Sequence, residues 1–341
     1  MEIYFATNRD QQGPDRRPKF GNRFNAMGPQ FFRVGRAELE RVPNEGFRVT
    51  SVELEPERLI KSPRDKTERL GSRALFDELR NKMRQENRDV LIFLHGFANT
   101  FESCLERGAQ LKERYLVRGA EPHVFVFSWP SDGKTFPVTA YHDDRSDAAA
   151  SGEAMARALA KLLDFLRQGG ERCGCRIHLV AHSMGNWALR HAVLGIRAHL
   201  ATDRLPQIFD NVFLMAADED DDAFEHDHKL KLLPQLSRAV HVYHSRNDQA
   251  LLISDTTKNN PDRLGARGPR RIEGLDTKVF LVDCQHVDET TTEDARHQYY
   301  RERAEVLRDV RQVLDDVPPD EVVGRRPTGA PRSFRILAEG A

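Results

Sequence analysis

The segment RIHLVAHSMGNWALRHAV, residues 176–193, joins an apolar, β-branched run directly to a segment with helical periodicity. Ser183 stands at the junction, with Ala181 two residues before it and Gly185 two residues after it. A sharp strand-to-helix turn needs small residues at those two places, because the neighbouring backbone would clash with larger side chains. The segment meets the pattern G-x-S-x-G with alanine at its first glycine. It therefore predicts a serine whose hydroxyl lies exposed beside the N-terminus of a helix.

The middle of the chain alternates apolar runs with segments of helical periodicity. The apolar runs are nearly continuous, as expected for parallel strands covered on both faces, and the alternation predicts one α/β layer fold. Strands are predicted at residues 89–97, 123–130, 176–183, 211–220, 239–248 and 278–284. Helices are predicted at about residues 100–117, 146–168, 184–200 and 223–236.

The two ends of the chain differ from this middle part. Three strand-like runs near the start are separated by Gly, Pro and Asn, and a helix is predicted at about 66–87. Because no long linker follows, we expect these strands to extend the sheet in the antiparallel sense. We predict a single domain over residues 1–316, in which residues 1–88 are N-terminal strands and a helix joined to the sheet. Residues 317–341, rich in Pro and Arg, are expected to form a loosely attached tail.

The charge balance and the cysteines narrow the classes of function. The 341 residues carry a formal net charge of -1 with 31% charged residues. The chain therefore has no net positive charge that would favour binding to nucleic acid or to an anionic membrane. The apolar runs are too short to span a bilayer, and the first 20 residues lack the pattern of a signal peptide, which predicts a soluble, cytoplasmic protein. The cysteines lack the spacing of a zinc site and are expected to be structural thiols. They are Cys104, Cys173, Cys175 and Cys284.

Ser183 has an alternative, purely structural interpretation as the N-cap of the following helix. Further features of the sequence favour a catalytic role. The run FLHGF (93–97) ends a predicted strand with His-Gly, where the backbone amides of Phe97 and Met184 are the natural donors of an oxyanion hole. Asp248 follows a later strand, and histidines follow the last one. Ser, then Asp, then His is the chain order expected of a catalytic triad on an α/β fold.

The acid and the base of this triad each have two candidates. Asp248 lies in the usual place between nucleophile and base, while Asp218 ends the preceding strand, where some hydrolases place their acid. For the base, His297 lies where the last loop meets the closing helix, whereas His286 directly follows the last strand. We favour Asp248 and His297, and keep the other two as alternatives.

Several segments together give the chain a family resemblance. It resembles the α/β-hydrolase superfamily, and within it a bacterial group of α/β hydrolases of unknown function. The resemblance covers residues 3 to about 300 and is specific for the fold, but not for the substrate. The matching segments are FATNR, FLHGFANTFE, FSWPSDG, LVAHSMGN, VYHSRNDQAL, RLGARGP and HQYY.

The resemblance implies an α/β-hydrolase fold and supports two of the site residues. The group's His-x-Tyr segment falls on HQY, which supports His297, and its NDQAL segment contains Asp248. Tyr141 and Asp144 also match the group. We expect His95, Trp129 and Tyr141 to contact the substrate, and for Trp129 the alternative is a place in the core.

A metal-binding interpretation of the run DEDDD (218–222), with His226 and His228 nearby, is less favoured. Acidic runs in loops are usually solvated, and the sequence shows no fixed ligand spacing. We therefore expect no metal and no cofactor.

The sequence thus predicts a serine hydrolase that cleaves a carboxylic ester, or a related acyl bond, of a small-molecule acyl substrate. Ser183 would be the nucleophile, His297 the base, and Asp248 the residue that orients the base. An amidase or peptidase would use the same residues, and a non-catalytic binding scaffold would keep the same fold. The sequence indicates no oligomeric state.

Overall fold

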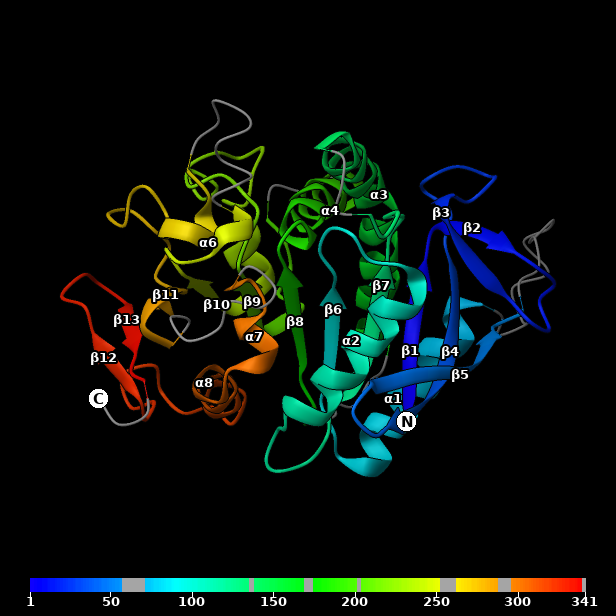
Figure 1. The fold of residues 1–341 in the computed structure, drawn as a ribbon, viewed down its shortest axis with the longest axis horizontal. Helices are drawn as coiled ribbons and strands as arrows, with labels where there is room; N and C mark the ends of the chain where they lie inside the picture. Colours follow the sequence, from blue (N-terminus) through cyan, green and yellow to red (C-terminus); the bar gives the residue numbers. More distant parts are fainter. Residues whose placement is uncertain are drawn as a thin grey trace.

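The computed structural model describes residues 1–56, 71–134, 138–168, 174–200, 204–251, 262–287 and 296–338. Over these ranges the strands form one large sheet and a separate hairpin, and helices cover the sheet (Figure 1). The strands are β1 (Glu2–Thr7), β2 (Arg9–Gln12), β3 (Lys19–Phe24), β4 (Arg33–Val42), β5 (Gly46–Leu54), β6 (Val90–Leu94), β7 (His123–Ser128), β8 (Ile177–His182), β9 (Phe209–Met215), β10 (Ser237–His244), β11 (Val279–Asp283), β12 (Arg325–Pro327) and β13 (Ser333–Ile336). The helices are α1 (Ser72–Glu86), α2 (Phe101–Arg114), α3 (Val138–Gln168), α4 (Gly185–Leu200), η2 (Leu233–Leu236), α6 (Leu264–Arg267), η3 (Gln285–Val287), α7 (Tyr299–Glu302) and α8 (Ala304–Leu314).

The large sheet is parallel in its middle and antiparallel at its two ends. Its order is β12-β13-β11-β10-β9-β8-β6-β7-β1-β4-β5. Every neighbouring pair from β13 to β1 is parallel, whereas β1–β4, β4–β5 and β12–β13 are antiparallel. The predicted α/β fold with extra antiparallel N-terminal strands is therefore confirmed.

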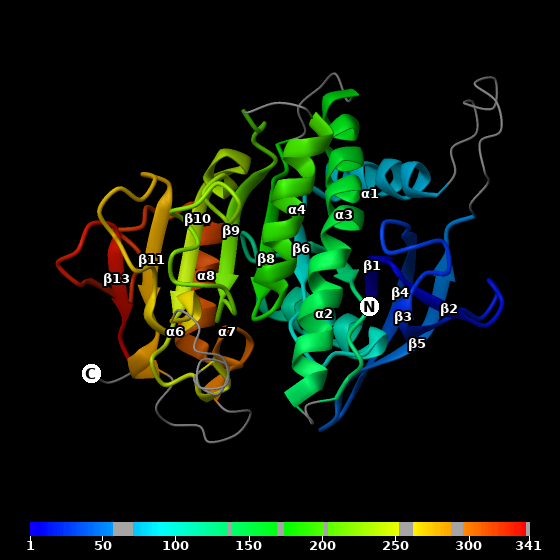
Figure 2. The same cartoon turned by 90° about the horizontal axis from the view of Figure 1, so that it is seen from above.

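The strands at the centre of the sheet are buried over their whole length, which explains their continuous apolar sequences. Every residue of β6, β7 and β8 is buried. The buried side chains of α1, α3 and α4 pack on one face, and those of α2, α7 and α8 pack on the other. Figure 2 shows α3 and α4 side by side on their face of the sheet. Two helical layers thus cover both faces, as the absence of strand alternation predicts.

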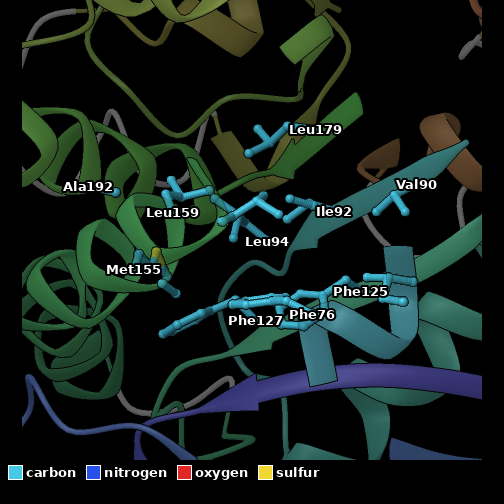
Figure 3. A pocket seen from close by; sticks show the side chains of 13 residues that line it. Phe76, Val90, Ile92, Leu94, Phe125, Phe127, Met155, Leu159, Leu179 and Ala192 are labelled. Atoms are coloured by element: carbon cyan, nitrogen blue, oxygen red, sulfur yellow. The ribbon is translucent and has the colours of Figure 1, made fainter. Parts of the chain in front are cut away.

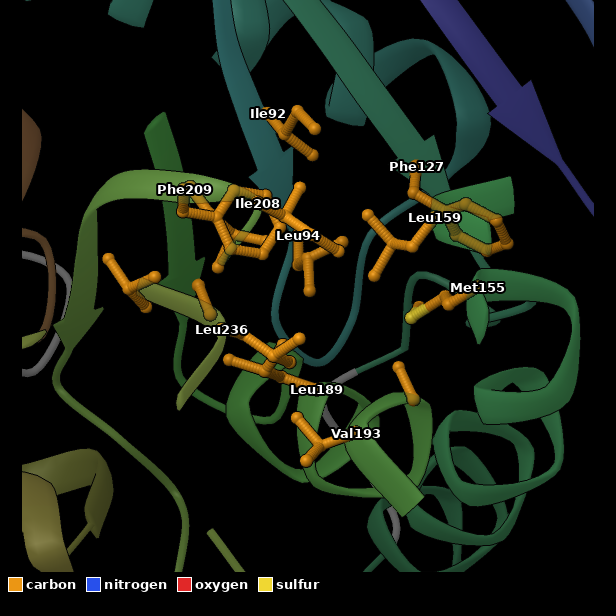
Figure 4. Packing of buried hydrophobic residues seen from close by; sticks show 14 of the residues in the cluster. Ile92, Leu94, Phe127, Met155, Leu159, Leu189, Val193, Ile208, Phe209 and Leu236 are labelled. Carbon is orange, nitrogen blue, oxygen red and sulfur yellow. The ribbon is translucent and has the colours of Figure 1, made fainter. Parts of the chain in front are cut away.

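The core beneath α3 and α4 contains an apolar pocket. Side chains of β6, β7 and β8 face those of α1, α3 and α4 around it (Figure 3). The surrounding packing continues across α4 towards β9 and η2, where Leu189, Val193, Phe209 and Leu236 meet (Figure 4). The pocket is lined by apolar residues, and because empty space provides no partner atoms, side chains at its wall lose packing contacts on that side.

Ile92, at the centre of β6, tests how much this packing stabilises the protein. Its side chain lines the pocket and is 6% exposed. We expect Ile92→Ala to lower the free energy of unfolding by about 2–5 kcal/mol, because it removes buried methyl groups and enlarges a void. The exposed Val323 provides the control, since Val323→Ala should change that free energy by less than about 0.5 kcal/mol. Urea unfolding followed by circular dichroism measures both, and equal midpoints would contradict the prediction.

The structure corrects the expectation of a loose tail over residues 317–341. Within it, β13 pairs in parallel with β11, and β12 pairs with β13. Phe334 and Ile336 of β13 are buried, and the guanidinium of Arg325 in β12 donates to the Asp309 carboxylate of α8. Of the Pro and Gly residues that suggested a tail, Gly329 and Pro331 lie in the turn between the two strands, and Pro318, Pro319 and Gly324 lie before β12.

A second correction concerns the helix expected at 223–236. These residues form turns followed by the short helix η2. Pro234 disfavours a continuous helix, because it has no amide hydrogen and restricts the residue before it. The Lys229 ammonium binds the carboxylates of Asp220 and Asp222, so side-chain contacts stabilise the turns instead.

None of the helices in the described ranges is long and apolar enough to cross a membrane.

Candidate active site

The residues predicted to form the site meet at one edge of the sheet. In a parallel sheet the carboxyl ends of all strands lie on the same side, where ligands bind. His95 follows β6, Ser183 follows β8, and Asp218 and Asp248 follow β9 and β10. His297 comes after β11, immediately before α7.

Ser183 occupies a strained turn between β8 and α4. Its φ angle is 53°, in the left-handed region that a residue with a side chain rarely adopts. Its amide donates to the Met215 carbonyl at 3.0 Å, and its carbonyl accepts from the amides of Asn186 and Asp218. The buried Asn186 side chain also donates to the carbonyls of Ala181 and Ser183, at 3.0 Å each. These bonds fix the sharp turn predicted for this segment. The expected exposure of the serine needs correction, because Ser183 is buried, with 7% of the residue exposed.

Two glycines let the end of β6 approach this turn closely. A Cβ added to Gly185 would lie 2.5 Å from the Leu94 carbonyl oxygen, and one added to Gly96 would lie 2.8 Å from the Ser183 Cβ. Both positions therefore exclude larger residues. The close approach brings the loop after β6 next to Ser183, as an oxyanion hole requires.

His297 and Asp248 form a buried pair. The Nδ1–H of His297 donates to the Asp248 carboxylate at 2.7 Å, and the side chain of Asp248 is fully buried. Burial lowers the pKa of His297, whereas the Asp248 charge and hydrogen bond raise it. The raising effects are the larger, so the pKa lies above the ordinary 6.5. The pair leaves Nε2 of His297 as the ring nitrogen able to accept a proton.

His182, the residue before Ser183, connects this pair to the strand β8. Its Nε2–H donates to the His297 carbonyl at 3.1 Å, and its ring stacks on Tyr300. Burial and the nearby His297 hold the pKa of His182 well below 6.5, so it stays neutral. The His182 and His297 ring centroids lie 4.6 Å apart. The loop carrying His297 is thereby packed against the residue next to Ser183.

The alternative candidates have different surroundings. His286 lies in η3 and is exposed. The Asp218 carboxylate accepts a hydrogen bond from the Tyr141 hydroxyl at 2.6 Å and lies 3.3 Å from the Arg263 guanidinium. The acid in contact with His297 is Asp248, which favours the preferred assignment of both residues.

The loop after β6 carries Phe97, one of the two predicted oxyanion donors. Over the part of the chain that the structure describes, the amides of Phe97 and Met184 make no backbone hydrogen bond outside helices and strands. The Phe97 ring packs edge-to-face on Tyr141, with centroids 5.7 Å apart. Phe97 and Tyr141 are both partly exposed, and contact between Tyr141 and the substrate stays a prediction.

The expectation that His95 and Trp129 contact the substrate needs correction, because both side chains are completely buried. Their rings stack with centroids 4.7 Å apart, and the Trp129 indole donates to the His95 carbonyl. The His95 Nδ1–H donates to the Gly96 carbonyl, while its Nε2 accepts from the Trp129 amide. The two buried rings therefore pack against each other and connect the loop after β6 to the end of β7.

The acidic run 218–222 is largely buried and paired, and this corrects the expectation of a solvated loop. Its carboxylates contact cationic side chains from other elements. The cations are Arg145, Arg190, Lys229, Arg263 and Arg270. Burial raises the pKa of Glu219 to about 7, although Arg190 opposes this shift. Within the described residues, no group of three acidic, His or Cys side chains is placed to hold a metal ion.

A mostly parallel sheet with a serine in a strained strand-to-helix turn defines the α/β-hydrolase class. The family model described as an alpha/beta hydrolase of unknown function (DUF900) matches residues 72–316, so the chain belongs to that family. A search of the curated proteins found no match.

Proposed function

We propose that this α/β hydrolase cleaves a carboxylic ester or a related acyl bond through Ser183, His297 and Asp248. The observation that supports this most directly is the buried Asp248–His297 pair, which packs on the residue preceding the strained Ser183. A serine hydroxyl is a weak nucleophile near neutral pH and needs an adjacent base. The pair provides a base whose tautomer is set by a carboxylate.

The proposed reaction has two halves. Ser183 Oγ attacks the acyl carbonyl while His297 Nε2 takes its proton, and the amides of Phe97 and Met184 stabilise the oxyanion. His297 then returns the proton to the departing alcohol, leaving an acyl-serine. Water, deprotonated by His297, attacks this acyl group, which leaves as a carboxylic acid and restores the serine.

Reaction of Ser183 with a fluorophosphonate tests this proposal. The hydroxyl should displace fluoride and form a Ser183–phosphorus bond, which intact-protein mass spectrometry and peptide mapping detect. Wild type should also release 4-nitrophenol from 4-nitrophenyl acetate, and Ser183→Ala should lose both reactions.

Ser146, an exposed serine of α3, provides the matched control, because Ser146→Ala should keep the adduct and the hydrolysis. A folded wild-type protein that forms no adduct and hydrolyses no ester would refute the proposed function and support a binding scaffold instead.

A further inference from the structure

Arg9 lies at the same sheet edge as the candidate site, although it comes from the N-terminal strands. It follows β1, whose neighbour β7 runs parallel to it, so the carboxyl ends of both strands meet there. The Arg9 side chain is buried, with 1% of the residue exposed. The family match begins at residue 72, well after Arg9.

The Arg9 guanidinium contacts both the loop after β6, which carries Phe97, and the segment at the end of β7. Its Nη2 donates to the Asn99 carbonyl at 2.7 Å, and its Nη1 donates to the Ser131 carbonyl at 3.0 Å. Nε donates to the Ser128 hydroxyl at 2.9 Å, and Nη1 also donates to the Gly21 carbonyl at 3.0 Å. A planar guanidinium with several fixed donors can hold these carbonyls in one arrangement, which a lysine ammonium cannot reproduce.

Asn99 lies in the same loop as Phe97, the predicted oxyanion donor, and its side chain connects the Arg9 contact to that part of the loop. Its side-chain amide donates to the carbonyls of Gly96, at 2.9 Å, and Phe97, at 2.8 Å. Its backbone amide donates to the Ser131 hydroxyl at 3.0 Å. Asn99 is completely buried, so its position depends on these protein contacts.

In a planar peptide bond, fixing the carbonyl group also fixes the direction of the N–H of the next residue. The Gly96 carbonyl and the Phe97 N–H belong to one planar trans peptide, in which they point in opposite directions. Holding the Gly96 oxygen on Asn99 and His95 therefore sets the direction of the Phe97 N–H. A hydrogen-bond donor stabilises an oxyanion only when it already points at the developing charge.

Asp144 of α3 contacts the same loop. Its carboxylate accepts from the Ala98 amide at 3.2 Å and from the Ser131 hydroxyl. Ala98 has a φ angle of 56°, so the loop is held in a strained conformation that needs such support. A buried cation at Asn99 and a buried carboxylate at Ala98 thus both constrain the loop.

We propose that Arg9 is a positioning residue that orients the Phe97 N–H for oxyanion stabilisation, acting through Asn99. This inference rests on the proposed function, because it concerns the transition state of that reaction. By this inference the N-terminal segment contributes to catalysis, although the family model matches only residues 72–316.

The test compares Arg9→Met with Arg325→Met in hydrolysis of 4-nitrophenyl acetate. Arg325 is an arginine whose side chain is also almost fully buried and which donates to Asp309 of α8, so its variant controls for general loss of stability. We expect Arg9→Met to lower kcat by about 10- to 100-fold, with KM changed less than about twofold. Arg325→Met should keep kcat within about threefold of wild type. Arg9→Lys should fall between wild type and Arg9→Met.

Two further measurements separate positioning from a general structural role. A trifluoromethyl ketone forms a hemiketal oxyanion on Ser183, so its inhibition constant should rise by the factor by which kcat/KM falls. Arg9→Met and Asn99→Ala should be non-additive, because both interrupt the same connection to the loop.

Three results would overturn the inference: a folded Arg9→Met with kcat within about threefold of wild type, a rise in KM alone, or an additive double variant. If Arg9→Met does not fold, the same readouts on Arg9→Lys decide the question. A wild type inert to fluorophosphonate would refute the proposed function itself, which is a different outcome from an active enzyme that does not need Arg9.

Discussion

Replacing His297 with alanine should lower kcat for ester hydrolysis by about a million-fold, the typical loss when the base of a serine triad is removed. The reason is that Ser183 would then lose its proton acceptor, and the departing alcohol would lose its proton donor. The buried hydrogen bond between His297 and Asp248 makes this ring, rather than His286, the expected base. The measurement is steady-state kinetics with 4-nitrophenyl acetate.

His286 provides the matched control for this experiment. It is exposed in η3, so His286→Ala should keep most of the activity. Circular dichroism must show that both variants are folded. The opposite ranking would transfer the role of base to His286, and full activity in both variants would refute the triad.

Replacing Asp248 with asparagine should lower kcat by about ten thousand-fold. Asparagine keeps the shape of the side chain, but it removes the negative charge that stabilises the imidazolium and allows the wrong tautomer of His297. Asp218→Asn should cost much less, because the Asp218 carboxylate contacts Tyr141 and Arg263. A larger loss in Asp218→Asn than in Asp248→Asn would instead identify Asp218 as the acid.

The pH profile of the same variant gives an independent readout. Because the pKa of His297 is raised above 6.5, the base is protonated and inactive below that raised value, and kcat/KM should increase as the pH passes through it. Asp248→Asn removes the charge that raises this pKa, while the burial that lowers it remains. The acidic limb of the residual activity should therefore move to lower pH. An unchanged limb would mean that another group controls it.

The central fold could be predicted because its strands carry their own signal. β6, β7 and β8 are buried on both faces, and their sequences are continuously apolar. β13 gave no such signal, because it has only four residues, follows a region rich in Pro and Gly, and depends on pairing with β11. Its place in the sheet comes from tertiary contacts, which a local pattern does not contain.

The candidate site shows the same division. The small residues around Ser183 predict its turn, because the steric requirement is local. The burial of His95 and Trp129 depends on how two separate strand ends stack, and the pairing of 218–222 depends on cations far away in the sequence. Arg9 was visible only as part of the segment FATNR, and its contacts with Asn99 and Ser131 appear only in the folded chain.

The position of the family match within the sheet has a practical consequence for recombinant fragments. A fragment limited to residues 72–316 would lack β1 and β13, and would leave β7 and β11 as new edge strands. Both strands are mostly apolar, and each would present unpaired backbone groups to other molecules. Exposed apolar edges of this kind promote aggregation. Poor solubility of such a fragment would then result from the loss of β1 and β13 beside β7 and β11. It would not be evidence about the chemistry of Ser183.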